Sequence, residues 1–229
     1  MRSPKVPPML ALLVTEALSV LNGAVFDSLG RCPQCGGPVS GYDMRQRRFA
    51  RLTGIEGVQT ITVLVKRFRC LSCGTICNAD EPFYPATRIG APVIDLCIVF
   101  SQAFGYGRGA RNLSVMGMEI DRMRCRHYAQ IPVGPVPSLN MYGFPVPQSI
   151  LSLSGLVTNF AEGGRVKGAE ALAACGFPSA HRAALHPPPP RKERDERDEQ
   201  ERDEERDVKE PEYGTHQKRP GEQGNRDTP

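Results

Sequence analysis

The chain has 229 residues, of which 40% are hydrophobic and 7% aromatic, and its length allows one ordinary domain or two small ones. The formal net charge of +4 conceals an asymmetry: residues 1–186 hold 19 Lys and Arg against 11 Asp and Glu, whereas residues 187–229 hold 10 against 14. A basic body predicts a polyanionic partner. No segment approaches the roughly 18 apolar residues that a membrane span needs, which argues against an integral membrane protein.

The N-terminal segment MRSPKVPPMLALLVTEALSVLNGA combines early positive charge with an apolar run. Glu16 interrupts that run, so the pattern favours an amphipathic helix from about Pro8 to Leu21 over a secretory signal. Asn22-Gly23 is a typical helix end. We therefore expect residues 1–30 to form an N-terminal helix and the protein to be cytoplasmic, with no membrane partner.

Four of the eight cysteines form two CxxC motifs, each followed by glycine. The motifs supply Cys32 with Cys35 and Cys70 with Cys73. Two intervening residues let both sulfurs of a motif point at one ion, and the glycine permits the left-handed backbone that closes the turn. Four thiolates satisfy a tetrahedral Zn²⁺ and leave no open position. The motifs therefore predict one structural zinc ion per chain, and not a catalytic site.

Cys77 leaves the ligand set open, because it follows Cys73 by four residues and could replace it. Cys73-Gly74 repeats the pattern of Cys35-Gly36, which favours Cys73. A redox CxxC is the alternative to a metal site, but it is typical of a helix N-terminus in a βαβ unit, and the sequence indicates no such unit. The remaining three cysteines are isolated and typical of small core residues, namely Cys97, Cys125 and Cys175.

Residues 58–70 alternate β-branched Ile61, Val63 and Val65 with other residues, which predicts a strand. The preceding segment, 42–57, offers a second strand and a turn bounded by glycines. Two strands joined by a turn, each next to a cysteine pair, predict a zinc ribbon over residues 31–86, which we expect to unfold in a Cys70→Ser variant. Arg67 and Arg69 share one face of the second strand and are candidates for phosphate contact.

Residues 87–130 predict three helices, over about 92–104, 108–117 and 118–130. A short helix, a glycine-containing turn and a second helix form a helix-turn-helix outline, whose last helix would enter the major groove of DNA. In that helix Ile120 and Met123 are expected to face the core, and three arginines to project toward DNA, namely Arg122, Arg124 and Arg126. The alternative is an ordinary helical hairpin with a solvated arginine face.

Residues 131–186 read as a Pro/Gly-rich loop with one short helix around 166–175. Residues 187–229 open with four prolines and continue with alternating charges and almost no apolar residue, which predicts a disordered tail. The expected fold class is therefore α+β: a small zinc ribbon, a helix-turn-helix-like helical region and a disordered charged C-terminal tail.

The motifs CPQCGG, KRFRCLSCGTI and RGARNLS, followed by a basic third helix, resemble the N-terminal region of insertion-sequence transposases over about residues 31–130. The RFRCLSC junction is the most specific part of the likeness. The resemblance implies a zinc ribbon and a helix-turn-helix that together bind double-stranded DNA at the ends of the element. It implies the ligands Cys32, Cys35, Cys70 and Cys73, with DNA contacts among the strand arginines and the third helix.

A transposase also needs an RNase H-like domain with an Asp-Asp-Glu triad that binds two metal ions. After Asp121 the body of this chain holds only two carboxylates, Glu162 and Glu170, so we expect no enzymatic activity. The chain then resembles a truncated or stand-alone relative that binds DNA, with itself or a full-length transposase as further partner. Two alternatives stay open: a transcriptional regulator of the zinc-finger antitoxin type, and a zinc ribbon used only for protein contacts.

Overall fold

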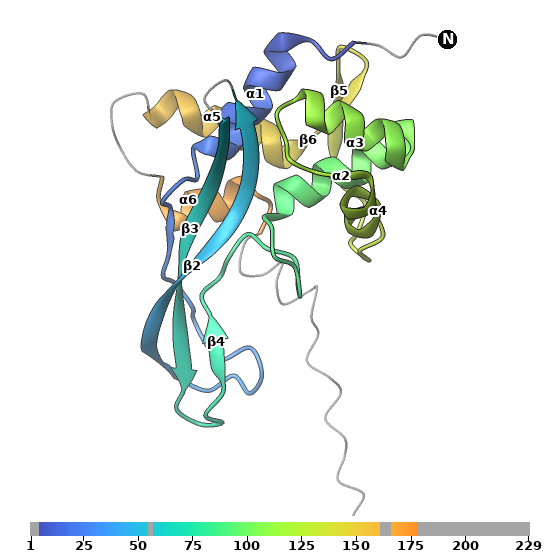
Figure 1. Cartoon of the computed structure of the whole chain (residues 1–229). Helices are drawn as coiled ribbons and strands as arrows, with labels where there is room; N and C mark the ends of the chain where they lie inside the picture. The colour runs from blue at the N-terminus through green and yellow to red at the C-terminus, as the bar shows by residue number, and fades with distance from the viewer. Residues whose placement is uncertain (1–4, 55–56, 161–165, 178–229) are drawn as a thin grey trace, which may run out of the picture. The chain divides into compact units, whose positions relative to one another are not determined.

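The computed structural model describes residues 5–54, 57–160 and 166–177, and there the fold is α+β, as predicted (Figure 1). The predicted tail, 187–229, lies outside the described residues. The elements in chain order are α1 (Pro8–Ser19), β1 (Val25–Phe26), β2 (Val39–Gly54), β3 (Gly57–Cys70), β4 (Ile76–Asn78), α2 (Ala91–Phe104), α3 (Tyr106–Val115), α4 (Arg122–Ala129), β5 (Ser138–Met141), β6 (Phe144–Pro147), α5 (Gln148–Phe160) and α6 (Gly168–Ala174).

A long hairpin of β2 and β3 organises the sheet (Figure 1). The two strands are antiparallel from Val39 opposite Cys70 to Gly54 opposite Gly57, which confirms the predicted pair of strands joined by a turn. β3 is the inner strand, because it also pairs in parallel with β1 and antiparallel with β4. At about 3.3 Å per residue, the hairpin holds the cysteine motifs about 45 Å from its tip.

The hairpin buries different positions along its length. Toward the tip Ile61, Val63 and Val65 of β3 are buried, as their alternation predicted, and they join the helices in one hydrophobic core. Toward the cysteines the buried positions shift to Phe68 and Cys70, and the register with β2 is irregular in this half. The segment predicted as a separate ribbon thus shares its core with the segments predicted as separate helical regions.

The helices pack around α2, whose first ten residues are all buried. α2 contacts α3, α4, α5 and β6, while α1 packs on α5. A buried carboxylate ties three segments together: Asp95 of α2 accepts hydrogen bonds from the Tyr84 hydroxyl and from Ser149 of α5, both at 2.7 Å. None of the helices in the described ranges is long and apolar enough to cross a bilayer.

Residues 138–160 differ from the predicted loop. β5 and β6 form a hairpin whose two turn residues, Tyr142 and Gly143, have φ of 55° and 82°. Positive φ at both positions is the mark of a two-residue type I′ turn. α5 follows directly, and α6 matches the short helix predicted around residues 166–175.

The connection between α3 and α4, residues 116–121, lies along β2. The Thr53 N–H donates to the Gly117 carbonyl at 2.6 Å, and the Glu119 N–H donates to the Arg51 carbonyl at 3.1 Å. Its six residues exceed the three or four of a compact helix-turn-helix. The three predicted helices are thus present, and their use as a helix-turn-helix stays a prediction.

The buried face of α4 differs from the one predicted. Met123, expected in the core, is 70% exposed, and Cys125 is the buried residue of this helix. Ile120 is half-buried in the preceding turn. The helix begins at Arg122, one residue after its N-cap, so its eight residues bring Cys125 and not Met123 toward α2.

Candidate metal centre

The two CxxC motifs adopt the same turn. In each, the N–H of the first cysteine donates to the carbonyl five residues later, at 3.0 Å for Cys32 and 2.9 Å for Cys70. The glycine N–H then donates back to the carbonyl of that cysteine, at 2.9 Å for Gly36 and 3.1 Å for Gly74. The two glycines have φ of 71° and 73°, which confirms the left-handed conformation predicted from the sequence.

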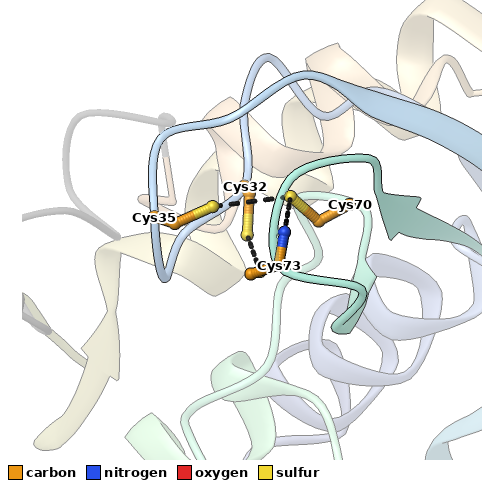
Figure 2. A group of neighbouring side chains, drawn as sticks. All are labelled: Cys32, Cys35, Cys70 and Cys73. Carbon is orange, nitrogen blue, oxygen red and sulfur yellow. Dashed lines mark hydrogen bonds between the residues drawn. The ribbon is translucent and has the colours of Figure 1, made fainter.

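The two turns face one another and bring four sulfurs together (Figure 2). Cys32 Sγ lies 3.7 Å from Cys73 Sγ, Cys35 Sγ lies 3.5 Å from Cys70 Sγ, and all four lie within 4.8 Å of one another. Sulfurs bound tetrahedrally at about 2.3 Å from an ion are about 3.8 Å apart, whereas disulfide sulfurs are about 2.05 Å apart. The cysteines are free, and their spacing fits one metal ion.

Hydrogen bonds from the turns stabilise the thiolate forms that bind metal. The N–H groups of Ser72 and Cys73 donate to Cys70 Sγ at 3.4 and 3.5 Å. The backbone N–H of Cys35 lowers the pKa of Cys32, and hydrogen bonds from the Thr75 side chain and backbone lower the pKa of Cys73 to about 6. Donors aimed at a sulfur favour its charged form.

Contacts between the turns hold them in this arrangement. Thr75 Oγ1 donates to Gln34 Oε1 at 2.9 Å, and the Leu71 N–H donates to the Pro38 carbonyl at 2.9 Å. A Cβ on Gly37 would lie 2.4 Å from Ser72 Oγ, so only glycine fits where the second turn crosses the first. These contacts connect the two CxxC turns directly.

Cys77 lies beside this group without joining it. It is buried in β4, and its Sγ is 3.8 Å from that of Cys32. Burial raises the pKa of Cys77 to about 11, which favours the neutral thiol. The sulfurs of Cys32, Cys35, Cys70 and Cys73 all lie within 4.8 Å of one another, and Cys77 is not part of that group. The geometry thus supports Cys73 as the fourth ligand. The other three cysteines are buried in the core, as expected: Cys97, Cys125 and Cys175.

The strand arginines differ from each other. Arg67 forms a salt bridge with Asp43 on β2, donating from Nε to Oδ1 at 2.6 Å, and its guanidinium lies 5.5 Å from the Tyr42 ring. This pair lowers the pKa of Asp43 and offsets the charge of Arg67. Arg69 is exposed and makes no salt bridge within the described ranges. Arg69 is thus the better placed of the two for a phosphate.

The three arginines of α4 are all exposed. The Asp121 carboxylate caps the helix by accepting the Arg124 N–H at 2.8 Å, and it also lies 3.3 Å from Arg124 Nε. The other two lie toward the start of α3: the Arg126 guanidinium is 5.9 Å from the Tyr106 ring, and Arg122 Nε is 3.9 Å from the Cβ position of Gly107. Arg122 and Arg126 therefore share one side of the helix.

A second group of arginines was not predicted from the sequence to belong to a functional site. Arg45, Arg47 and Arg48 of β2 lie around one cavity with Arg88. The run MRQRRFAR, read as a strand, contains part of the signal, because Arg45 and Arg47 are alternate residues and share a face, whereas the adjacent Arg48 belongs to the opposite face. The sequence does not show that Arg88, forty residues later, lies beside them.

The described residues hold one group of four cysteines that could bind a metal ion. Such a closed set of thiolates suits a structural site, since it offers no position for substrate. Comparisons of the chain with protein-family models, curated proteins and solved structures returned no match.

Proposed function

We propose that the protein is a DNA-binding module built around one structural Zn²⁺ per chain, and that it performs no catalysis. The observation that carries the proposal is the exposure of α4. This helix buries only Cys125 and presents Arg122, Arg124 and Arg126 to solvent. A helix held by one buried residue leaves most of its surface for a partner, and guanidinium groups match phosphate oxygens and guanine edges.

Zinc is the ion that fits the four cysteines best. Zn²⁺ accepts four thiolates in a tetrahedron and is not redox-active, and the sulfur separations of 3.5 and 3.7 Å agree with that geometry. The ion would fix the end of the hairpin where Arg69 is exposed. Its role is to hold the two turns together.

Within α4, we expect Arg122 and Arg126 to contribute most to the affinity for DNA. Arg124 is engaged by Asp121, whereas the other two lie beside Tyr106 and Gly107 at the start of α3. A helix that enters the major groove reads bases with residues near its N-terminus and contacts phosphates along its flank.

The resemblance to the N-terminal region of transposases suggests which DNA the module would bind. The module would recognise the ends of a mobile element, acting with another copy of itself or with a full-length transposase. The catalytic triad would then belong to that partner, because the residues that resemble the family are limited to about 31–130.

Titration of fluorescent duplex DNA at several salt concentrations tests this function. We expect the affinity to fall steeply with salt, and an Arg122→Gln/Arg126→Gln variant to bind at least about tenfold more weakly, with a smaller salt slope. An Arg45→Gln/Arg88→Gln variant is the matched control, because it removes the same charge from exposed residues elsewhere. Equal losses in both variants, or binding that ignores salt, would contradict the role of α4.

A further inference from the structure

A cavity of about 670 Å³ lies outside the proposed metal centre and outside α4. Its walls come from residues 45–48 of β2, from the segment that precedes α2, and from Phe177. The lining residues include four arginines against one glutamate, a net charge of +3. This size falls within the range of pockets for small molecules, and the charge favours an anion.

The single glutamate is already engaged. Glu81 is buried, forms a salt bridge with Arg47 and accepts a hydrogen bond from Asn78 Nδ2 at 2.8 Å. Arg47 also donates to the Thr87 carbonyl at 2.7 Å, and its guanidinium lies 3.8 Å from the centre of the Phe83 ring. Arg47 and Glu81 are therefore a fixed, mutually neutral support for the cavity.

The charges of the other three arginines are not neutralised by a salt bridge within the described residues. These three, Arg45, Arg48 and Arg88, are exposed. Arg45 acts on Asp43 only at longer range, where it helps to lower the pKa of that carboxyl group. Arg45 and Arg88 therefore bring like charges to one concave surface, and a multivalent anion relieves the repulsion between them.

The segment that carries Arg88 is held in an uncommon conformation. Ala86 has φ of 58°, in the left-handed region that residues other than glycine seldom adopt. The following residue fixes it, because the Thr87 hydroxyl donates to the Tyr84 carbonyl at 2.6 Å and the Thr87 N–H donates to the same carbonyl at 3.1 Å. Such conformations persist where neighbouring contacts impose them, and they gather at ligand sites.

The lining selects phosphate groups over an aromatic base. The rings around the cavity are buried: Phe83 is covered by Arg47, and the Tyr84 hydroxyl is bonded to Asp95. Little aromatic surface remains for stacking, whereas the arginines offer several forked donors, which match phosphate oxygens. The volume exceeds what one phosphate needs.

We propose that this cavity binds the polyphosphate group of a small molecule through Arg45 and Arg88. The ligand class is a linear polyphosphate or a nucleoside polyphosphate, held by its phosphate chain. The site is independent of the proposed DNA contacts on α4, and it gives the protein a small-molecule ligand in addition to its proposed macromolecular partner.

Calorimetric titration of the full chain with tripolyphosphate, in a buffer free of phosphate, tests the site. We expect one ligand per chain, and at least about tenfold weaker binding for Arg45→Gln/Arg88→Gln, since each substitution removes charged donors to the phosphate oxygens. Arg122→Gln/Arg126→Gln has the same net charge and should bind tripolyphosphate like the unchanged protein. Thermal unfolding of each variant checks that it is folded.

Parallel titrations with ATP and with duplex DNA identify the source of the phosphate. Binding of ATP that also requires Arg45 and Arg88 supports a nucleoside polyphosphate, and binding of tripolyphosphate alone supports the linear form. Absence of binding by either, or equal weakening in both variants, overturns the proposal. So does a loss confined to duplex DNA, which would assign these arginines to the DNA surface.

Discussion

At the scale of single residues, hydrogen bonding and burial distinguish Cys73 from Cys77, the two candidates for the fourth ligand. The backbone N–H of Thr75 donates to Cys73, whereas Cys77 is enclosed by β4 and its surroundings. Donors favour the thiolate of Cys73, and burial favours the thiol of Cys77. A thiolate is the metal-binding form, so the environment of Cys73 agrees with the choice that its CxxC-Gly motif favours.

A pair of alanine variants distinguishes these roles. Cys73→Ala should lose the bound metal, from about one ion per chain to near none, because three thiolates leave the tetrahedron incomplete. Cys77→Ala should keep about one ion per chain and lose only packing around a small buried side chain. Metal content of the purified variants, measured by elemental mass spectrometry, checks this. Loss of metal in Cys77→Ala together with retention in Cys73→Ala would reverse the assignment.

At the scale of elements, the connection between α3 and α4 acts as a short strand on the edge of β2. It occupies backbone groups at residues 51–53 that a sheet edge would otherwise leave open, and it fixes the point from which α4 departs. Gly117 makes this possible, because its φ is 81° and a Cβ there would lie 2.9 Å from the Thr53 carbonyl oxygen.

Substituting this glycine tests the docking. Gly117→Ala should destabilise the fold by about 1–2 kcal/mol for the left-handed backbone and by about 1–3 kcal/mol more for the collision. Gly23→Ala is the matched control, since its φ is 77° and nothing lies within 4 Å of its Cβ position, so it should show only the first cost. Denaturant unfolding measures both. Equal losses in the two variants would mean that the contact with β2 contributes nothing.

Sequence patterns within a short stretch of residues correctly predicted several helices and strands. The alternation of Ile61, Val63 and Val65 gave β3, and the spacing of apolar residues after Pro92 gave α2. The β5–β6 hairpin was missed because its turn is Tyr142-Gly143, and not the usual Asn-Gly or Asp-Gly. α5 follows Pro145 and Pro147 without a gap, so the prolines concealed it in a segment that reads as loop.

Contacts between distant segments could not be predicted in the same way. The pairing of β1 with β3, the lining of the cavity by Arg88 next to β2, and the burial of Cys125 in place of Met123 depend on how elements pack. Periodicity places a residue on a face of its own helix or strand. It does not say which neighbour will cover that face. The four proposed ligands were predicted because both CxxC turns are local motifs.

At the scale of the whole molecule, the hydrophobic residues form two groups of unequal size. The large core spans α1 to Phe177 and includes the half of the hairpin near its tip. The small one holds only Cys32, Cys70 and Cys77, with Leu29 and Val39 packed against it. A group of this size cannot order two turns by burial alone, because fixing each residue costs about 1–2 kcal/mol. The metal ion would supply what the small group lacks.

Removal of the metal should therefore loosen one end of the molecule and leave the other folded. With a chelator, we expect backbone amides at residues 29–41 and 67–78 to lose protection from hydrogen exchange, because the sulfurs that join the two turns then repel or protonate. Amides of α2 should keep their protection, since Ile94, Leu96 and Phe100 are fully buried in the large core. Hydrogen exchange followed by mass spectrometry resolves the two regions in one experiment.

The same experiment refines what a Cys70→Ser variant should do. The substitution would unfold the whole of residues 31–86 only if that segment folded as an independent unit. Ile61, Val63 and Val65 instead belong to the large core. Exchange should therefore rise near Cys70 and stay slow near Ile61, so that β3 is protected along only part of its length. Uniform exchange along β3, or unfolding of α2 together with the cysteine turns, would show that the ion stabilises the entire fold.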